Sequence, residues 1–194
     1  MNGTKEAILQ TALSLFARDG YEAVSVSMIA GELNVTKGAL YRHYKSKREI
    51  FDSIVRRMEQ MDSERAAEYE MPEENAYQTA WKSMELEKIK AYTRAQFIYW
   101  TEEEFSSNFR KLLTLEQYRN AEMAKLYQMY VAGGPLFYTA ELFRAFTQND
   151  EDAQRLALDF YGPVFLLYSV YDGAEDKAAV FGMLCSHLES FELK

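Results

Sequence analysis

Apolar residues recur at intervals of three and four along most of the chain, which is the spacing of amphipathic helices. The first such stretch predicts a helix over residues 4–19, with Ile8 and Phe16 on its apolar face. Thr4 is a candidate N-cap for this helix, and Gly20 stands where a C-terminal cap is expected. No segment shows a clear strand pattern, so we expect an all-α fold.

Short helical patterns follow, each preceded by a residue that caps helices. Ser25 is a candidate N-cap for the first, Thr36 for the second and Ser46 for a longer third. The second is predicted over residues 37–44, and Asn34 before it tolerates the left-handed backbone of a tight turn. A helix followed by two short helices with a tight turn between them is the arrangement of a helix-turn-helix DNA-binding unit.

The run VTKGALYRHYKSK, residues 35–47, is basic and contains no acidic residue. Leu40 and Tyr44 are predicted to face the core, which turns the other side of their helix outward. Lys37 and Arg42 can then donate to base edges or to the DNA backbone in a major groove, while hydroxyl and ring N–H groups can donate to phosphate oxygens. The positions on or beside this surface are Thr36, Lys37, Gly38, Ala39, Tyr41, Arg42, His43 and Lys47.

Charge is unevenly distributed along the chain. The net charge is -8, yet residues 1–57 hold nine Lys and Arg against six Asp and Glu, a balance of +3 that leaves -11 for residues 58–194. The acidic remainder does not prevent DNA binding, because charges more than about 8 to 10 Å away are largely screened at ordinary salt.

Residues 4–56, and the run VTKGALYRHYKSKREIF above all, resemble the DNA-binding domain of the TetR family of bacterial transcriptional repressors. Asn34 departs from the family pattern, which usually has Gly there, and the N-terminal arm offers only Lys5. The resemblance implies DNA contacts at the positions of Ser27, Thr36, Lys37, Gly38, Ala39, Tyr41, His43 and Lys47.

Beyond Met58 the pattern stays helical. A charged stretch over residues 62–74 is the expected linker, and an acidic start is predicted for a helix at residues 102–104. Further helices are predicted over 76–101, 115–131, 136–146 and 150–171, followed by one last helix, with a break at 133–135. The expected architecture is an N-terminal three-helix helix-turn-helix DNA-binding domain, residues 1–46, joined to a larger helical ligand-binding and dimerisation domain, residues 47–194.

Residues 58–194 hold 23 of the 28 aromatic residues, which favours an apolar cavity for a flat or greasy small molecule. Plain core packing is the alternative for each ring. The resemblance implies an inducer-binding body and so strengthens the case for a pocket. The candidate ligand-binding residues are Trp81, Tyr92, Phe97, Trp100, Tyr127 and Phe137.

The last two predicted helices carry wide apolar faces, which favours pairing with a second copy in a four-helix interface. The resemblance implies the same arrangement, and the alternative is that both helices complete the core of a monomer. The candidate interface residues are Phe160, Val164, Leu167, Phe181, Leu184 and Leu188.

These features predict a homodimeric, sequence-specific DNA-binding regulator, a repressor released from a palindromic operator by a small hydrophobic or aromatic inducer. The alternative is a DNA-binding adaptor whose C-terminal body binds a protein partner. No enzymatic activity, metal site or cofactor is expected, since Cys185 and His187 are two apart on a helix and face away from each other. With no signal peptide or membrane-spanning run, we expect a soluble cytoplasmic protein.

Overall fold

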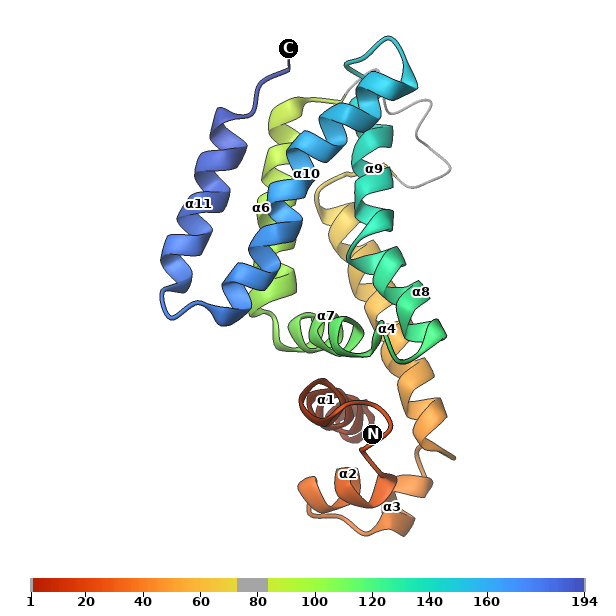
Figure 1. Ribbon diagram of the computed structural model, residues 1–194. Coiled ribbons are helices and arrows are strands. Elements are labelled where there is room, and N and C mark those ends of the chain that lie inside the picture. Colours follow the sequence, from red (N-terminus) through yellow and green to blue (C-terminus); the bar gives the residue numbers. More distant parts are fainter. Residues whose placement is uncertain (1, 73–83, 194) are drawn as a thin grey trace. The chain divides into compact units, whose positions relative to one another are not determined.

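The computed structural model describes residues 2–72 and 84–193, and every regular element in these ranges is a helix (Figure 1). The predicted all-α fold is confirmed. The chain divides into two compact units: Met1–Arg65 with Glu104–Lys125, and Ala66–Glu103 with Leu126–Lys194. The domain boundary predicted between residues 46 and 47 separates proposed functions and does not coincide with the limits of these two units. It stays a prediction.

The first unit contains the helix-turn-helix segment and the helices packed against it. Its helices are α1 (Asn2–Asp19), α2 (Val26–Glu32), α3 (Lys37–Tyr41), most of α4 (Lys47–Glu68), α7 (Glu104–Glu116) and the start of α8 (Ala121–Tyr130). α1 packs against α7 and α2, and α2 packs against α3. Leu13, Phe16, Ile29, Leu40 and Ile54 are fully buried and form the centre of this core.

Polar caps and one glycine set the ends of the short helices. Ser25 Oγ accepts the Met28 N–H at 3.2 Å, and Thr36 Oγ1 accepts the Ala39 N–H at 3.1 Å, so both predicted caps are confirmed. Gly20 ends α1 with φ +88°. The predicted cap at Thr4 is wrong, because α1 begins at Asn2 and Thr4 lies inside it.

The turn between α2 and α3 forms as predicted, whereas α3 is shorter than predicted. Asn34 has φ +55°, in the left-handed region. α3 ends at Tyr41 instead of Tyr44, because the Arg42 and His43 N–H groups bond to carbonyls three residues back and not four. The Lys45 N–H then bonds to the Glu49 carboxylate of the next helix. Leu40 and Tyr44 are buried, which confirms the predicted inward face.

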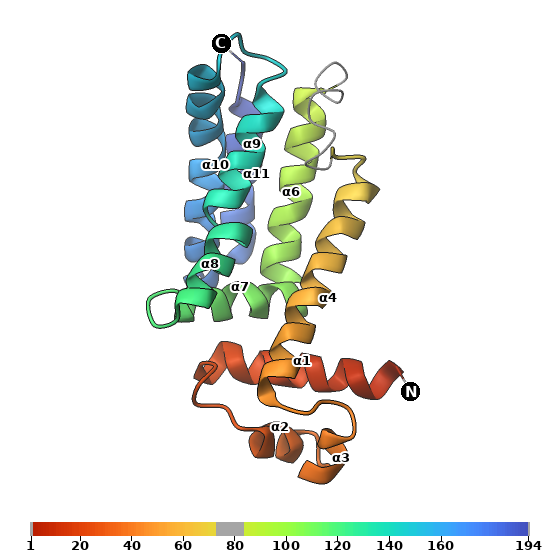
Figure 2. The same cartoon turned by 90° about the vertical axis from the view of Figure 1, so that its right-hand side faces the viewer.

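The second unit is also built from helices. They are α6 (Leu86–Glu102), α9 (Gly133–Phe143), α10 (Asp150–Gly173) and α11 (Lys177–Ser190), with the ends of α4 and α8. α10 packs against α9, α11 and α6, and α11 also packs against α6 (Figures 1 and 2). Aromatic rings fill the spaces between them, as where Phe97 stacks on Tyr168 with ring centroids 5.1 Å apart.

Several predicted element boundaries are wrong in this part of the chain. The predicted linker at 62–74 is helical as far as Glu68, and the described part of the helix predicted over 76–101 begins at Leu86. The helix predicted from residue 115 begins at Ala121, because the Asn120 side chain caps it through the Glu122 and Met123 N–H groups. Residues 133–135 form the first turn of α9 instead of a break, a position where a proline loses no helical hydrogen bond.

None of the helices in the described residues combines the length and the apolar character that a membrane-spanning helix needs.

Candidate nucleic-acid interface

The α2–α3 surface, defined as the solvent-exposed side of these two helices and of the turn after α3, carries the predicted DNA-contacting residues. Leu40 is 1% exposed and anchors α3 to the core, whereas Tyr41 next to it is 43% exposed. Ala39, His43 and Lys47 are half-buried at the edge of this surface. The exposed members of the predicted set are Ser27, Thr36, Lys37, Gly38, Tyr41 and Arg42.

Lys37 and Tyr41 lie one turn apart on α3 and contact each other. The Lys37 ammonium lies 5.7 Å from the centre of the Tyr41 ring, a cation–π arrangement. A Cβ added to Gly38 would meet only Thr36 Oγ1, at 3.9 Å, so the backbone is open to solvent there. The exposed side of α3 therefore presents a positive charge, a phenol and bare backbone side by side.

Lys47 is turned toward the protein. Its ammonium donates to the Tyr21 carbonyl at 2.8 Å and to the Glu22 carbonyl at 3.4 Å, and it lies 4.3 Å from the centre of the Tyr21 ring. It also pairs with the Glu22 carboxylate at 3.7 Å. These contacts hold the α1–α2 link against the start of α4, a role that its position in a basic run does not indicate.

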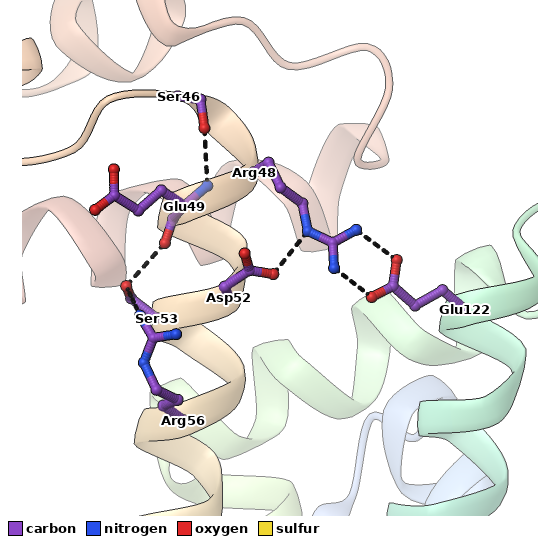
Figure 3. A network of polar contacts seen from close by, with 7 residues as sticks. All are labelled: Ser46, Arg48, Glu49, Asp52, Ser53, Arg56 and Glu122. Atoms are coloured by element: carbon purple, nitrogen blue, oxygen red, sulfur yellow. Dashed lines mark hydrogen bonds and ion pairs between the residues drawn. The ribbon is translucent and has the colours of Figure 1, made fainter.

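A polar network follows α3 at the start of α4 (Figure 3). Ser46 Oγ accepts the Glu49 N–H at 3.1 Å, and the Glu49 carboxylate in return accepts the Lys45 N–H at 2.6 Å, a close relative of the capping box. Arg48 binds Asp52 one turn on, at 2.7 Å, and both carboxylate oxygens of Glu122 from α8, at 2.6 Å each. The hydrogen bonds that Arg48 donates to Glu122 and then to Asp52 raise the pKa of its guanidinium above the usual value, so Arg48 stays charged.

Residues 8–54 match the family model described as bacterial regulatory proteins of the tetR family. The match covers α1 from its first buried residue, both helices of the helix-turn-helix and the start of α4. The chain carries the N-terminal domain of the TetR family. The predicted resemblance is confirmed for this domain.

Known proteins agree with this assignment. Over 47 residues, 24% of the chain, it is 47% identical to the Bacillus subtilis helix-turn-helix transcriptional regulator YerO, covering 16% of that protein. Over 52 residues, 27% of the chain, it is 35% identical to IcaR of Staphylococcus aureus strain Newman, a negative transcriptional regulator of the biofilm operon icaADBC, covering 28% of it. The chain spans less than half the length of curated relatives such as these.

The whole fold is similar to that of a solved protein from Saccharomonospora viridis, described as a transcriptional regulator in complex with choline. The two chains superpose over the full length of both with a TM-score of 0.67 and 17% sequence identity. At this identity the likeness establishes the fold alone.

Outside the TetR-family domain, the described members of the predicted ligand-binding set differ in how far they are buried. Phe97 is fully buried and contacts Tyr168 and Tyr171, which makes it core. Trp100 is 6% exposed and contacts Tyr130, and Tyr127 is also buried. Trp81 lies outside the described residues.

Two other aromatic groups in the second unit are more open. Tyr92 is half-buried and contacts the rings of Tyr69 and Tyr138, at 5.7 and 6.5 Å between centroids. Phe137 is 59% exposed and lines a half-open groove of about 350 Å³ between α9 and α10, together with Leu158 and the Arg144–Asp150 ion pair.

Most of the residues predicted for a dimer interface are buried in the second unit. The buried members are Phe160, Val164, Leu167, Leu184 and Leu188, each less than 10% exposed, and their place in an interface stays a prediction. Phe181 is half-buried. The exposed large apolar side chains of the same two helices are Leu158, Phe165, Leu166, Val170 and Met183. Apolar residues spaced three and four apart locate the apolar faces of a helix. The sequence alone does not say which of these faces packs against the rest of the same chain.

Proposed function

We propose that this chain is a homodimeric, sequence-specific DNA-binding repressor that a small hydrophobic or aromatic inducer releases from a palindromic operator. The observation that carries the proposal is the α2–α3 surface. Within a TetR-family domain, α3 presents Lys37, Tyr41 and Arg42 to solvent while Leu40 fixes its inward side. The basic and hydroxyl groups on the exposed side of α3 support the proposal, because a helix of this kind enters a major groove with such a side.

The division of labour on this surface follows from the chemistry of each group. Lys37 and Arg42 can donate to guanine edges or phosphates, and the Tyr41 hydroxyl suits a phosphate oxygen. The exposed backbone at Gly38 lets α3 approach the DNA closely. The Thr36 hydroxyl caps α3, so the rest of the Thr36 side chain is left to pack against DNA. Most of these contacts position the protein, and Lys37 and Arg42 are the expected readers of sequence.

A second copy supplies the second half-site. One short helix contacts too few base pairs to select a site, whereas a two-fold dimer places two of them about 34–36 Å apart. The exposed apolar face, defined as Leu158, Phe165, Leu166, Val170 and Met183 on α10 and α11, is the surface we propose for this pairing. IcaR, a relative in the N-terminal domain, is a negative regulator, which supports repression.

The aromatic content of the second unit supports the inducer. The structure from Saccharomonospora viridis holds choline, so a protein with this fold accommodates a small organic ligand. In this chain the open rings of Tyr92, Tyr69 and Tyr138 are better candidates for contact than the buried Phe97. A ligand loosens DNA binding only by the difference between its affinities for the two arrangements of the protein.

One observation favours the second candidate, a DNA-binding adaptor. The α9–α10 groove is half-open and lined by the exposed Phe137 and Leu158, and a partner's side chains could fill it. An adaptor predicts that a protein partner protects this groove and that no small molecule changes DNA affinity.

Selection of bound fragments from a random DNA pool with the purified full-length chain tests the proposed function. We expect a palindrome whose half-sites lie about one helical turn apart, bound more weakly as salt rises. Lys37→Ala should change the selected bases, Tyr41→Phe should weaken all sequences alike, and Lys111→Ala on the exposed side of α7 serves as the charge control. Equal affinity of the wild-type chain for the selected palindrome and for random DNA would exclude the proposal.

A further inference from the structure

Two acidic side chains at one corner of the first unit reach the segments that flank the helix-turn-helix. The α7–α8 corner comprises residues 116–122. Glu116 Oε1 accepts the Tyr21 N–H at 3.0 Å, in the link before α2. The Glu122 carboxylate binds the Arg48 guanidinium, in the first turn of the helix after α3. The corner thus contacts the chain on both sides of the DNA-reading helices.

The Tyr21 contact is partly buried, and other contacts support it. Glu116 is 4% exposed, and its carboxylate is shielded from competing water. The Tyr21 carbonyl accepts the Lys47 ammonium at 2.8 Å, and the Tyr21 ring packs on Phe16 and Phe51, with centroids 5.1 and 5.3 Å away. With both its backbone groups and its ring held, Tyr21 fixes where the chain enters α2.

The Arg48 contact uses every nitrogen of the guanidinium, as Figure 3 shows. The two terminal nitrogens bind Glu122 in a parallel pair, and Nε binds Asp52 at 2.7 Å. Glu122 is itself held, because its N–H donates to Asn120 Oδ1 at 2.9 Å. A planar fork of this kind fixes direction as well as distance, unlike a single surface ion pair.

We propose that the α7–α8 corner is a positioning element for the recognition helix α3, with Glu122 acting through Arg48 and Glu116 acting through Tyr21. Glu122 holds the first turn of α4, and residues 42–46 connect that turn directly to α3. Glu122 therefore favours DNA binding although it carries a negative charge and need not touch DNA. This inference rests on the proposed function and names residues that the DNA surface itself does not contain.

The sign of one substitution separates this role from a simple charge effect. If Arg48 and Glu122 act only through charge, Arg48→Gln weakens DNA binding and Glu122→Gln strengthens it, because one removes a positive and the other a negative charge. If Glu122 positions α4 through Arg48, both substitutions weaken binding and the double variant is no weaker than Arg48→Gln alone.

The experiment measures the affinity of the full-length chain and these variants for the selected palindrome at fixed salt. We expect Glu122→Gln to bind about 3- to 30-fold more weakly than wild type, the range of couplings carried by contact networks. Glu59→Gln, which removes the same charge from an exposed site on α4, is the matched control and should bind at least as tightly as wild type. Wild-type or tighter binding by Glu122→Gln would overturn the proposal.

A second measurement needs no DNA. Amide hydrogen exchange of the free protein should be faster over residues 42–50 in Glu122→Gln than in wild type, and unchanged in Glu59→Gln. Unchanged exchange in Glu122→Gln would overturn the positioning role. If the wild-type chain selects no DNA sequence, the proposed function fails, while the exchange result still decides whether Glu122 holds the connection between α3 and α4.

Discussion

Lys47 shows how a basic residue beside a DNA-reading helix can serve the fold. Its side chain is 23% exposed, and its ammonium is divided between two backbone carbonyls, one carboxylate and the Tyr21 ring. A phosphate would have to compete with these contacts. The exposed charges of Lys37, Arg42 and Lys45 remain available, so the positive face of the α2–α3 surface is narrower than the count of basic residues indicates.

Gly20 is a residue whose replacement should damage the fold without touching the α2–α3 surface. Its φ of +88° lies in the left-handed region, and an added Cβ would lie 2.7 Å from Glu116 Oε1. We expect Gly20→Ala to destabilise the protein by about 1–2 kcal/mol from backbone strain, with a further loss if Glu116 is displaced from Tyr21. The shift of the urea unfolding midpoint measures this.

Gly31→Ala is the matched control for that measurement. Gly31 lies inside α2, where a Cβ would meet nothing within 4 Å. Its replacement should leave stability unchanged or raise it by up to about 1 kcal/mol, the helix propensity difference between Gly and Ala. Equal losses in the two variants would show that φ at residue 20 is not the cause.

At the level of elements, α2 and α3 are too short to be stable alone, since isolated helices of fewer than about 12–15 residues are marginal in water. Their caps compensate, together with the packing of α2 onto α1 and of α3 onto α2. Each has a hydroxyl cap and at least one fully buried aliphatic anchor, Ile29 in α2 and Leu40 in α3.

Loss of the α2 cap should separate stability from DNA contact. Ser25→Ala removes the acceptor for the Met28 N–H and should cost about 1 kcal/mol of unfolding free energy, with operator affinity of the folded protein unchanged. Ser27→Ala, two residues on at an exposed position, should leave stability unchanged and weaken operator binding. Urea unfolding and DNA titration of both variants measure these effects. Weaker operator binding by folded Ser25→Ala, or lower stability of Ser27→Ala, would contradict the prediction.

The elements that could be predicted from the sequence are those whose causes are local. The caps at Ser25, Thr36 and Ser46, the left-handed Asn34 and the buried Leu40 all follow from residue type and spacing over four or five positions. The Arg48–Glu122 pair could not be predicted, because it joins residues 74 apart whose proximity depends on the path of the chain between them.

The ends of helices were harder to predict than their centres, because they too depend on contacts that residue type and spacing do not reveal. Residues 62–68 are highly charged, and charge favours a linker, yet they continue α4 as a solvated helix. For the dimer candidates the period correctly identified α10 and α11 as helices with apolar faces. Apart from the half-buried Phe181, the residues chosen are ones that the chain buries itself, because the largest apolar stripe is the one that its own core uses first.

For the whole molecule, the main feature is the exposed apolar face on α10 and α11, which consists of large apolar side chains open to solvent. Leu166 is 61% exposed and Met183 is 57% exposed, on helices whose opposite sides are already packed. Apolar residues exposed singly are normal, but several along two neighbouring helices indicate an interaction surface.

Leu166→Glu should convert the proposed dimer to a monomer and abolish tight binding to the proposed palindrome while leaving helical content intact. A buried carboxylate without a partner is costly at an interface, and at the surface of a monomer it is harmless. Met129→Glu on α8, at a side chain 59% exposed, is the control and should stay dimeric. Sedimentation equilibrium measures both, and a Leu166→Glu protein that sediments as a dimer would place the interface elsewhere.

The first unit is assembled from two stretches of sequence, Met1–Arg65 and Glu104–Lys125, and this limits how genes for such proteins can be recombined. A fusion that transfers only residues 1–46 or 1–65 to another body leaves behind α7, against which α1 packs, and the carboxylates of Glu116 and Glu122. The new body must supply a helix of matching shape with acids at matching places. Exchange of operator specificity between regulators is therefore simpler by changing residues on α3 than by exchanging whole N-terminal segments.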